Sequence, residues 1–315
     1  MADDRQPNGS SSLTPSAPSV PRPLQLDMTV LGTRVHPDMT RVVGNFLARF
    51  IDRPNIEIEA KLGFVLAKSD GRRANLPVLS ACVLFNNDQA HTPIAGGNWY
   101  RFESNMEQRQ YQFYNDYFNQ RVHDTHQSGY RDTPVNYVHT KEIDRFYPGE
   151  SGPDGKPGGK IRVTYDRKTD KVVNNGIVQK VRLANLDIFS PQTPFDFRIS
   201  VSTETPVAHP TTQCFLERNK DRLSYAYGLW NFDLTYVKTS PVHQDTNDKR
   251  FRPYPTSRGN DRASTSFEVE VELRDPKRLV YEHSRLRRGD TRHQYHDIVQ
   301  SLLDNVQGLA AKYRS

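Results

Sequence analysis

Glutamates alternate with apolar residues in two short stretches of the chain. Residues 56–61 read I-E-I-E-A-K, and residues 267–273 read F-E-V-E-V-E-L. This alternation is typical of β-strands, whose successive side chains point to opposite faces, so each stretch places its glutamates on one face. A row of carboxylates repels itself unless a cation lies among them. Either stretch alone is equally compatible with a solvent-facing strand, but two of them in one chain favour a shared cation site.

Basic residues follow the same two-residue period elsewhere. Residues 218–222 read R-N-K-D-R, which places three cations on one strand face. Residues 198–204 place an arginine, two serines and a glutamate on another face. If these rows faced solvent, they would form ion pairs that each contribute little stability, which does not explain why glutamates gather on two strands and cations on others. Neighbouring strands add Arg162, Lys180 or Arg182, and Asp233 with Thr235.

The two kinds of row fit the interior of one closed barrel. A barrel of about eight antiparallel strands has an interior that side chains or a ligand must fill. Carboxylates on one side and Arg and Lys on the other suit a metal-bound polyphosphate, because carboxylate oxygens bind Mg²⁺ or Mn²⁺ and guanidinium groups grip phosphate. The Cys and His spacing does not support zinc. The sequence has no Gly-rich phosphate loop followed by Lys-Ser or Lys-Thr, which excludes a Walker-type nucleotide site.

The remaining stretches predict the elements that hold these rows in place. Apolar residues recur at helical spacing from Pro37, with Asp38 as a cap, up to residues 52–54. A second helix is predicted over 104–122 and a third over 292–313. The second carries an aromatic stripe that we expect in the core rather than as a base-stacking platform, made of Tyr111, Tyr114, Tyr117 and Phe118. Extended runs are predicted at 78–85, 138–147, 161–165, 178–183, 186–189, 195–204, 214–225, 230–237 and 266–273.

Turn and loop residues set the boundaries between these elements. Asn174-Asn175-Gly176 predicts a hairpin turn between two strands. Polar stretches over 149–159 and 240–262 predict surface loops. Residues 1–25 are rich in Ser and Pro and cannot bury enough apolar surface to offset their ordering entropy, so a disordered tail is predicted there. We expect residues 26–315 to form the catalytic domain.

Composition narrows the class of protein. The formal net charge of +6 over 315 residues favours an anionic partner without establishing one. The chain has two cysteines, Cys82 and Cys214, which cannot form a disulfide framework and which we expect to be buried and inert. No apolar run approaches the length that crosses a bilayer, and no secretory leader is recognisable, so the protein is expected inside the cell and away from membranes.

Several motifs together resemble a known enzyme family. Residues 57–61, E-I-E-A-K, match the ExExK motif of the triphosphate tunnel metalloenzymes, also called the CYTH superfamily. D-F-R-I-S at 196–200, R-N-K-D-R-L-S-Y at 218–225, D-L-T at 233–235 and E-V-E-V-E at 268–272 follow in that order. In this arrangement the chain resembles the fungal metal-dependent mRNA 5′-triphosphatases that begin cap synthesis. The resemblance covers about residues 26–315.

The resemblance implies both a fold and an activity. The fold would be α+β, a closed eight-stranded antiparallel β-barrel, or triphosphate tunnel, with packing helices. The activity would be hydrolysis of the γ phosphate of 5′-triphosphate RNA to leave 5′-diphosphate RNA and phosphate, with Mg²⁺ or Mn²⁺ as cofactor. The implied partners are the 5′-triphosphate end of nascent RNA, the mRNA guanylyltransferase or the phosphorylated tail of RNA polymerase II, and a second copy in a nuclear homodimer. The chain lacks the Trp-rich docking peptide of the budding-yeast-type enzymes, since its two tryptophans, Trp99 and Trp230, are expected within the fold.

The same resemblance implies a role for each row of charged residues. Glutamates of the two acidic strands would ligate the metal, and Glu204 would orient the attacking water, kept ionised by Arg198 on the same strand face. Lys220 and Arg222 would act on the phosphoryl group that is transferred. The implied metal ligands are Glu57, Glu59, Glu270 and Glu272, with Glu272 the principal one of the second strand. The implied phosphate-binding set is Lys61, Arg162, Lys180, Arg198, Arg218, Asp233 and Glu268.

Two other functions are compatible with parts of the sequence. The ExExK motif alone does not separate an RNA triphosphatase from another tunnel-family hydrolase that acts on inorganic tripolyphosphate or thiamine triphosphate. A non-catalytic module that binds polyphosphate or RNA is the second alternative. The complete carboxylate set argues against that module, because a pure anion binder gains nothing from several glutamates in its interior.

Overall fold

The computed structural model describes residues 35–85, 99–149, 158–242 and 263–314. The described residues from Pro37 onward form one compact unit. The disordered tail predicted over 1–25 lies outside the described residues, as do most of the two predicted surface loops. The prediction of a catalytic domain that begins at residue 26 therefore stays a prediction.

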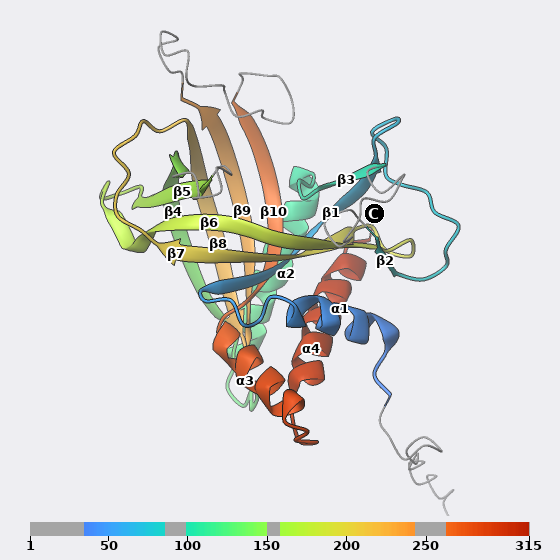
Figure 1. Ribbon diagram of the computed structural model, residues 1–315. Helices are drawn as coiled ribbons and strands as arrows, with labels where there is room; N and C mark the ends of the chain where they lie inside the picture. Colours follow the sequence, from blue (N-terminus) through green and yellow to red (C-terminus); the bar gives the residue numbers. More distant parts are fainter. Residues whose placement is uncertain (1–34, 86–98, 150–157, 243–262, 315) are drawn as a thin grey trace, which may run out of the picture. The chain divides into compact units, whose positions relative to one another are not determined.

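Eight antiparallel strands close into a barrel, as predicted (Figure 1). The closure is made by the last of these strands, which pairs with the first through Glu59 opposite Glu272 and Lys61 opposite Glu270. Two short strands extend the sheet outside the barrel, β2 (Cys82–Leu84) beside β6 and β3 (Tyr100–Glu103) beside β1. Around the barrel the order is β1 (Ile56–Ala67), β10 (Ser264–Leu273), β9 (Trp230–Pro241), β8 (Leu216–Tyr227), β4 (Asn136–Gly149), β5 (Gly158–Asp166), β6 (Val172–Phe189) and β7 (Asp196–Pro206).

The apolar core lies outside the barrel wall, between the strands and the helices. The helices are α1 (Asp38–Ala48), α2 (Gln108–Thr125), α3 (Pro276–Arg287) and α4 (Tyr295–Lys312). α4 packs on α1, β1, β7 and β10, and α2 packs on β9 and β10. Figure 1 shows α1, α3 and α4 gathered on one side of the barrel. None of the described helices is both long and apolar enough to cross a membrane.

Strand alternation decides which residues meet this outer core. On β1, Ile58 and Leu62 are completely buried in it, at 1% and 0% exposure. Their neighbours Glu57, Glu59 and Lys61 therefore point into the barrel. The aromatic stripe on α2 packs into this core, as predicted. Tyr114 and Phe118 are buried in it, and Tyr111 and Tyr117 are partly buried against it.

The predicted hairpin turn at Asn174-Asn175-Gly176 is wrong. The turn between β5 and β6 comes earlier, where the Asp166 carboxylate accepts hydrogen bonds from the backbone N–H groups of Lys168 and Thr169. Pairing then jumps from Tyr165 opposite Val172 to Val163 opposite Ile177, so residues 173–176 form a bulge inside β6. Asn175 adopts φ 54, the left-handed region that Asn tolerates well, and a Cβ at Gly176 would meet a backbone oxygen at 2.8 Å.

Several smaller expectations also differ from the structure. Runs 178–183 and 186–189 belong to the one strand β6, with a register shift between Arg182 and Ala184. α1 is preceded by Pro37 as its N-cap, while Asp38 is its first residue. α3 was not predicted, although Asp275 caps it by accepting the N–H of Lys277 and a proline begins it. Cys82, Cys214 and Trp99 are partly exposed rather than buried, and Trp230 is buried.

Candidate active site

The barrel encloses a charged cavity of about 440 Å³. All eight barrel strands contribute side chains to it. The structure brings together most of the residues that the sequence singled out. Those that line this cavity are Glu57, Glu59, Lys61, Arg162, Lys180, Arg182, Glu204, Arg218, Lys220, Arg222, Thr235, Glu268, Glu270 and Glu272.

Glutamates from β1 and β10 form the acidic side of the cavity. Glu59 lies directly opposite Glu272 in the strand pairing and is only 4% exposed. Burial, reinforced by Glu57 and other nearby carboxylates, raises the pKa of Glu272 to about 8. Burial likewise raises the pKa of Glu57, and the attraction of Lys180 does not offset it. Burial and neighbouring carboxylates together therefore disfavour the ionised forms of Glu57 and Glu272 when no cation lies among them.

Two lysines lie between these carboxylates, and Arg182 Nη2 lies 3.0 Å from Glu59. Lys180 Nζ contacts Glu57 and lies 3.2 Å from Glu204, and Lys61 Nζ contacts Glu270 and lies 3.2 Å from Glu59. Burial alone would raise the pKa of Glu59, but the nearby cations, Lys61 first among them, bring it well below its usual range. Each ammonium group bridges carboxylates of two different strands. Within the described ranges, no three acidic, His or Cys side chains are arranged as a formed metal site.

The opposite wall carries the cations of β5 and β8. Lys220 Nζ lies 2.8 Å from Asp144 and 3.2 Å from Glu142, and the lysine is 6% exposed. Burial and the adjacent Arg222 lower the pKa of Lys220 despite these two carboxylates. Arg162 Nη2 lies 3.0 Å from a carboxylate oxygen of Glu204. The basic wall is thus held in position by acidic neighbours.

Some buried polar atoms facing this region have no hydrogen-bond partner among the described residues. They belong to both walls of the barrel and include the Nε atoms of Arg162 and Arg222 and the hydroxyls of Ser202 and Thr235. A buried polar atom without a partner costs stability unless a ligand or water satisfies it. These atoms are available to a polar, anionic ligand.

Two acidic residues of the implied phosphate-binding set act on arginines. Asp233 Oδ2 lies 3.3 Å from Arg222 Nη1, and Asp233 itself is 3% exposed and does not line the cavity. Glu268 accepts a hydrogen bond of 2.9 Å from Arg218. A carboxylate repels phosphate, so both residues would serve phosphate binding by orienting these guanidinium groups.

The prediction that Arg198 keeps Glu204 ionised is wrong. The Arg198 guanidinium donates to both oxygens of Asp187, at 2.5 and 3.0 Å, and lines a second cavity instead. Six residues separate Arg198 from Glu204 on β7, which corresponds to about 20 Å. Burial would raise the pKa of Glu204, but Arg162 and Lys180 together lower it. Glu204 is therefore ionised at neutral pH through different neighbours.

Comparison with known proteins identifies the family. A family model described as mRNA capping enzyme, beta chain, matches residues 33–315. The chain belongs to this family. It is 33% identical to the mRNA-capping enzyme subunit beta of Schizosaccharomyces pombe over 230 residues, 71% of each chain. It is 31% identical to that of Cryptococcus neoformans over 278 residues, which cover 86% of this chain and 60% of the relative.

A solved structure of this family has the same fold. The S. pombe Pct1 RNA triphosphatase in complex with the Spt5 CTD matches with a TM-score of 0.73 at 29% identity, over 92% of this chain and 100% of that one. The predicted closed barrel with packing helices is confirmed by this likeness and by the strand order. Membership of the capping family favours an RNA triphosphatase over the two alternative functions, another tunnel-family hydrolase and a non-catalytic binding module.

Sequence reasoning missed several residues of the cavity, among them three polar ones. Glu142, Asp144 and Thr164 line it, and the Thr164 hydroxyl donates to Asp144 at 2.7 Å. The signal was present as Glu142-Ile143-Asp144, which alternates like the acidic strands. The next two residues obscure this alternation, because the charged Arg145 faces outward and the aromatic Phe146 lines the cavity.

The geometry of the Arg222 guanidinium leads to a first prediction. Arg222→Lys is expected to lower turnover by about tenfold or more, because an ammonium cannot keep contact with Asp233 and also present a planar fork to phosphate. Initial rates of phosphate release at saturating substrate provide the measurement, with the outward-facing Arg145→Lys on β4 as the matched control. Equal rates for wild type and Arg222→Lys would show that the planar fork is not needed.

Proposed function

We propose that the barrel removes the γ phosphate from the 5′-triphosphate end of RNA with the help of Mg²⁺ or Mn²⁺. Family membership makes this chain an mRNA 5′-triphosphatase that acts in capping, and the metal requirement is our own extension. One observation carries the proposal: a single cavity inside the barrel places the glutamates of β1 and β10 on one wall and the Lys and Arg side chains of β5 and β8 on the other.

The basic wall would bind the triphosphate. Arg162, Lys220 and Arg222 reach phosphate oxygens from two strands, and the buried Nε atoms of both arginines offer donors that no described residue uses. Negative charge moves onto the leaving diphosphate as the β–γ linkage breaks. Cations that are fixed in place beforehand stabilise that charge more strongly than they stabilise the substrate, so these contacts accelerate the reaction.

Glu204 would orient the water that attacks. Its carboxylate is ionised at neutral pH and accepts a hydrogen bond from the water, held in place by Arg162 and Lys180. The water oxygen bonds to the γ phosphorus while the bond to the β–γ bridging oxygen breaks. Glu204 takes the proton that the water loses and releases it to solvent. The products are inorganic phosphate and RNA with a 5′-diphosphate.

The residues present fit a divalent cation on the acidic side. Glu57, Glu59, Glu270 and Glu272 supply hard oxygen ligands of the kind that Mg²⁺ and Mn²⁺ prefer. Lys61 and Lys180 already bridge pairs of carboxylates there, which shows that the site accepts positive charge between strands. When bound, the cation would neutralise phosphate charge and polarise the phosphoryl group.

Cation binding should be coupled to proton release. Without a cation, the Glu272 carboxyl, with its pKa of about 8, is mostly protonated at pH 7. The Glu272 carboxyl group must lose its proton before it can bind the metal. The affinity for Mn²⁺ should therefore rise with pH up to about 8 and then level off. Calorimetric titration with Mn²⁺ in two buffers of different ionisation enthalpy measures the protons released.

Glu272 also predicts how the stability of the metal-free protein depends on pH. The pKa of this carboxyl is about 8 in the folded state, against an ordinary value of 4.5. Between these pH values the unfolded chain binds fewer protons, so stability should fall as the pH rises from 4.5 to about 8. Glu272→Gln should flatten this dependence of the melting temperature. An unchanged slope in Glu272→Gln would exclude Glu272 as its source.

Partners and location follow from the relatives and remain part of the proposal. The S. pombe RNA triphosphatase has been solved with the Spt5 CTD, which supports a partner related to the polymerase tail region for this chain. Association with the mRNA guanylyltransferase, a homodimer and residence in the nucleus are consistent with a role in capping. The chain covers 71% and 60% of the lengths of the two relatives named above.

A comparison of substrates tests the proposed function. Phosphate release would be measured with triphosphate-ended RNA and with inorganic tripolyphosphate, each with Mg²⁺, Mn²⁺ or a chelator. We expect RNA to be hydrolysed with the higher kcat/KM, and the chelator to abolish release. Hydrolysis of tripolyphosphate alone would favour the other tunnel-family function, and no release above background would favour a binding module.

A further inference from the structure

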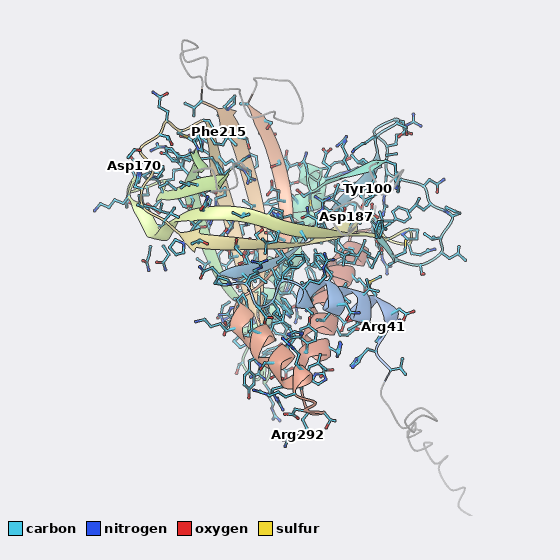
Figure 2. The ribbon with its side chains drawn as sticks, viewed as in Figure 1. Arg41, Tyr100, Asp170, Asp187, Phe215 and Arg292 are labelled. Carbon is cyan, nitrogen blue, oxygen red and sulfur yellow. The ribbon has the colours of Figure 1, made fainter. Side chains whose placement is uncertain are left out.

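A second cavity, of about 270 Å³, adjoins the one just described. The two share Lys61, Arg182, Arg218 and Glu268 in their linings, so the shared residues form the passage between them. The second cavity lies toward β3, which contributes Phe102. Figure 2 labels Asp187 and Tyr100 on this side of the barrel, away from Asp170 and Phe215.

The charge balance differs sharply between the two cavities. The first is lined by eight acidic and seven basic side chains. The second is lined by four basic side chains and one acidic side chain. Each of these four cations pairs with a carboxylate, but of those carboxylates only Glu268 lines the second cavity. The lining therefore presents more donors than acceptors to an anionic ligand.

An ordered flat surface lies in the wall of the second cavity. Asp187, which is 1% exposed, accepts two hydrogen bonds from the Arg198 guanidinium and so fixes its plane. The Phe102 ring lies under the same guanidinium, with 4.7 Å between the ring centroid and Cζ. Arg198 keeps 24% of its side chain exposed. Guanidinium planes and aromatic rings that are held rigid are the surfaces on which proteins stack unpaired RNA bases.

Two other arginines in the passage have donors to spare. Among the described residues, the Arg182 guanidinium makes one polar contact, from Nη2 to Glu59 at 3.0 Å, and Arg218 makes one, from Nη2 to Glu268 at 2.9 Å. A guanidinium carries five N–H donors, so most of them stay available in this part of the structure. They lie between the stacking surface and the wall that binds the triphosphate, where an α phosphate or the first phosphodiester would pass.

We propose that the second cavity binds the 5′-terminal nucleoside of the RNA, with its base stacked on Arg198 and Phe102 and its phosphates passing Arg182 and Arg218. This rests on the proposed function and adds the direction in which the RNA enters, from the β3 side. Recognition by stacking tolerates any base, which suits an enzyme that acts on all transcripts. At about 270 Å³ the cavity lies just below the roughly 300 Å³ at which pockets for drug-sized ligands begin, so it suits one small unit rather than a longer stretch of RNA.

The substitution Phe102→Leu tests nucleoside binding without changing a residue that acts in catalysis. Leucine keeps most of the packing volume but removes the aromatic face, and Phe102→Tyr is the matched control that retains it. We expect Phe102→Leu to raise KM for triphosphate-ended RNA about fivefold to tenfold, since stacking contributes roughly 1–3 kcal/mol per base. Its kcat and KM with tripolyphosphate, which has no nucleoside, should stay at wild-type values. Arg198→Lys, which keeps the charge beside Asp187 but loses the plane, should raise the same KM.

Asn174→Ala is the comparison at the other cavity, because Asn174 lines the first cavity and not the second. Its effect on KM for RNA should be smaller than that of Phe102→Leu. Wild-type KM for RNA in both Phe102→Leu and Arg198→Lys would overturn the proposal, as would an equal change with RNA and tripolyphosphate. A raised KM in Asn174→Ala alone would also overturn it, since RNA would then enter from the opposite side. Failure of the wild-type protein to hydrolyse RNA would instead reject the proposed function.

Discussion

Glu272→Ala is expected to lower the rate of γ-phosphate release by about 10³ or more, to near background. Removal of one charged ligand from a small oxygen site leaves the cation undercoordinated, and loss of one preorganised electrostatic contact commonly costs 10²–10³ in rate. Glu57→Ala and Glu59→Ala are expected to have the same effect. Initial rates of phosphate release at about 1 mM Mn²⁺, and at a series of lower Mn²⁺ concentrations, measure this loss of rate.

Folding should survive these substitutions, because alanine removes mutual repulsion among buried carboxylates as well as ion pairs. Glu217→Gln is the matched control: this glutamate lies on a barrel strand but pairs with Arg145 at 3.3 Å and does not line the cavity. It should keep near-normal activity. If Glu272→Ala or Glu59→Ala retained normal turnover at low Mn²⁺, the glutamates of β1 and β10 would not hold the metal.

Glu204→Gln should lower turnover by roughly 10²–10⁴, the range expected for loss of a general base. Glutamine keeps the size of the side chain and its contact with Arg162, but it cannot take a proton from water. The concentration of Mn²⁺ that gives half the maximal rate should barely change, because Glu204 lies among Arg162 and Lys180 rather than beside Glu272. Rates at saturating RNA over a Mn²⁺ series provide both quantities.

Glu59→Gln is the comparison for that experiment. Any activity that remains in Glu59→Gln should demand far more Mn²⁺, because a neutral amide is a weaker ligand than a carboxylate. The two variants therefore separate a change in the chemical step from a change in metal affinity. A shift in the Mn²⁺ requirement of Glu204→Gln as large as that of Glu59→Gln would make Glu204 a ligand and leave the water without its base.

Strict alternation of residue types is what made the barrel interior predictable. On β1 and β10 every second residue is charged and its neighbours are apolar, so the period alone assigns Glu59 and Glu272 to one face. The structure pairs these two residues directly across the closure of the barrel. The two strands that were easiest to read are also the two that close the sheet.

Reasoning from alternation fails on β6, because this strand contains a bulge. The register shift between Arg182 and Ala184 changes which residues face inward, so Asn185 lines the second cavity and Asp187 meets Arg198. Simple alternation from Lys180 would have placed Ala184 there instead. Nothing local in the sequence marks such a shift, because it depends on how β6 pairs with β7. The pairing of Arg198 with Asp187, and hence the second cavity, followed only from the structure.

Alternation also says nothing about which charges touch across strands. The sequence placed Lys220 among the cations, but its partners, Glu142 and Asp144, come from β4, which is next to β8 only because of the strand order. In the same way, Lys180 reaches Glu57 across the interior rather than along a strand pair. Such contacts depend on barrel closure and strand tilt, which no local pattern encodes.

RNA labelled with different isotopes on its β and γ phosphates tests the central claim most directly. The label in the γ phosphate should appear as inorganic phosphate, at a rate that needs Mg²⁺ or Mn²⁺ and is lost in Glu272→Ala. The label in the β phosphate should stay on the RNA. Release of both labels together as pyrophosphate would contradict hydrolysis by this charged barrel. Release of the γ label in chelator, or in Glu272→Ala, at the rate of the wild type with Mn²⁺ would contradict it as well.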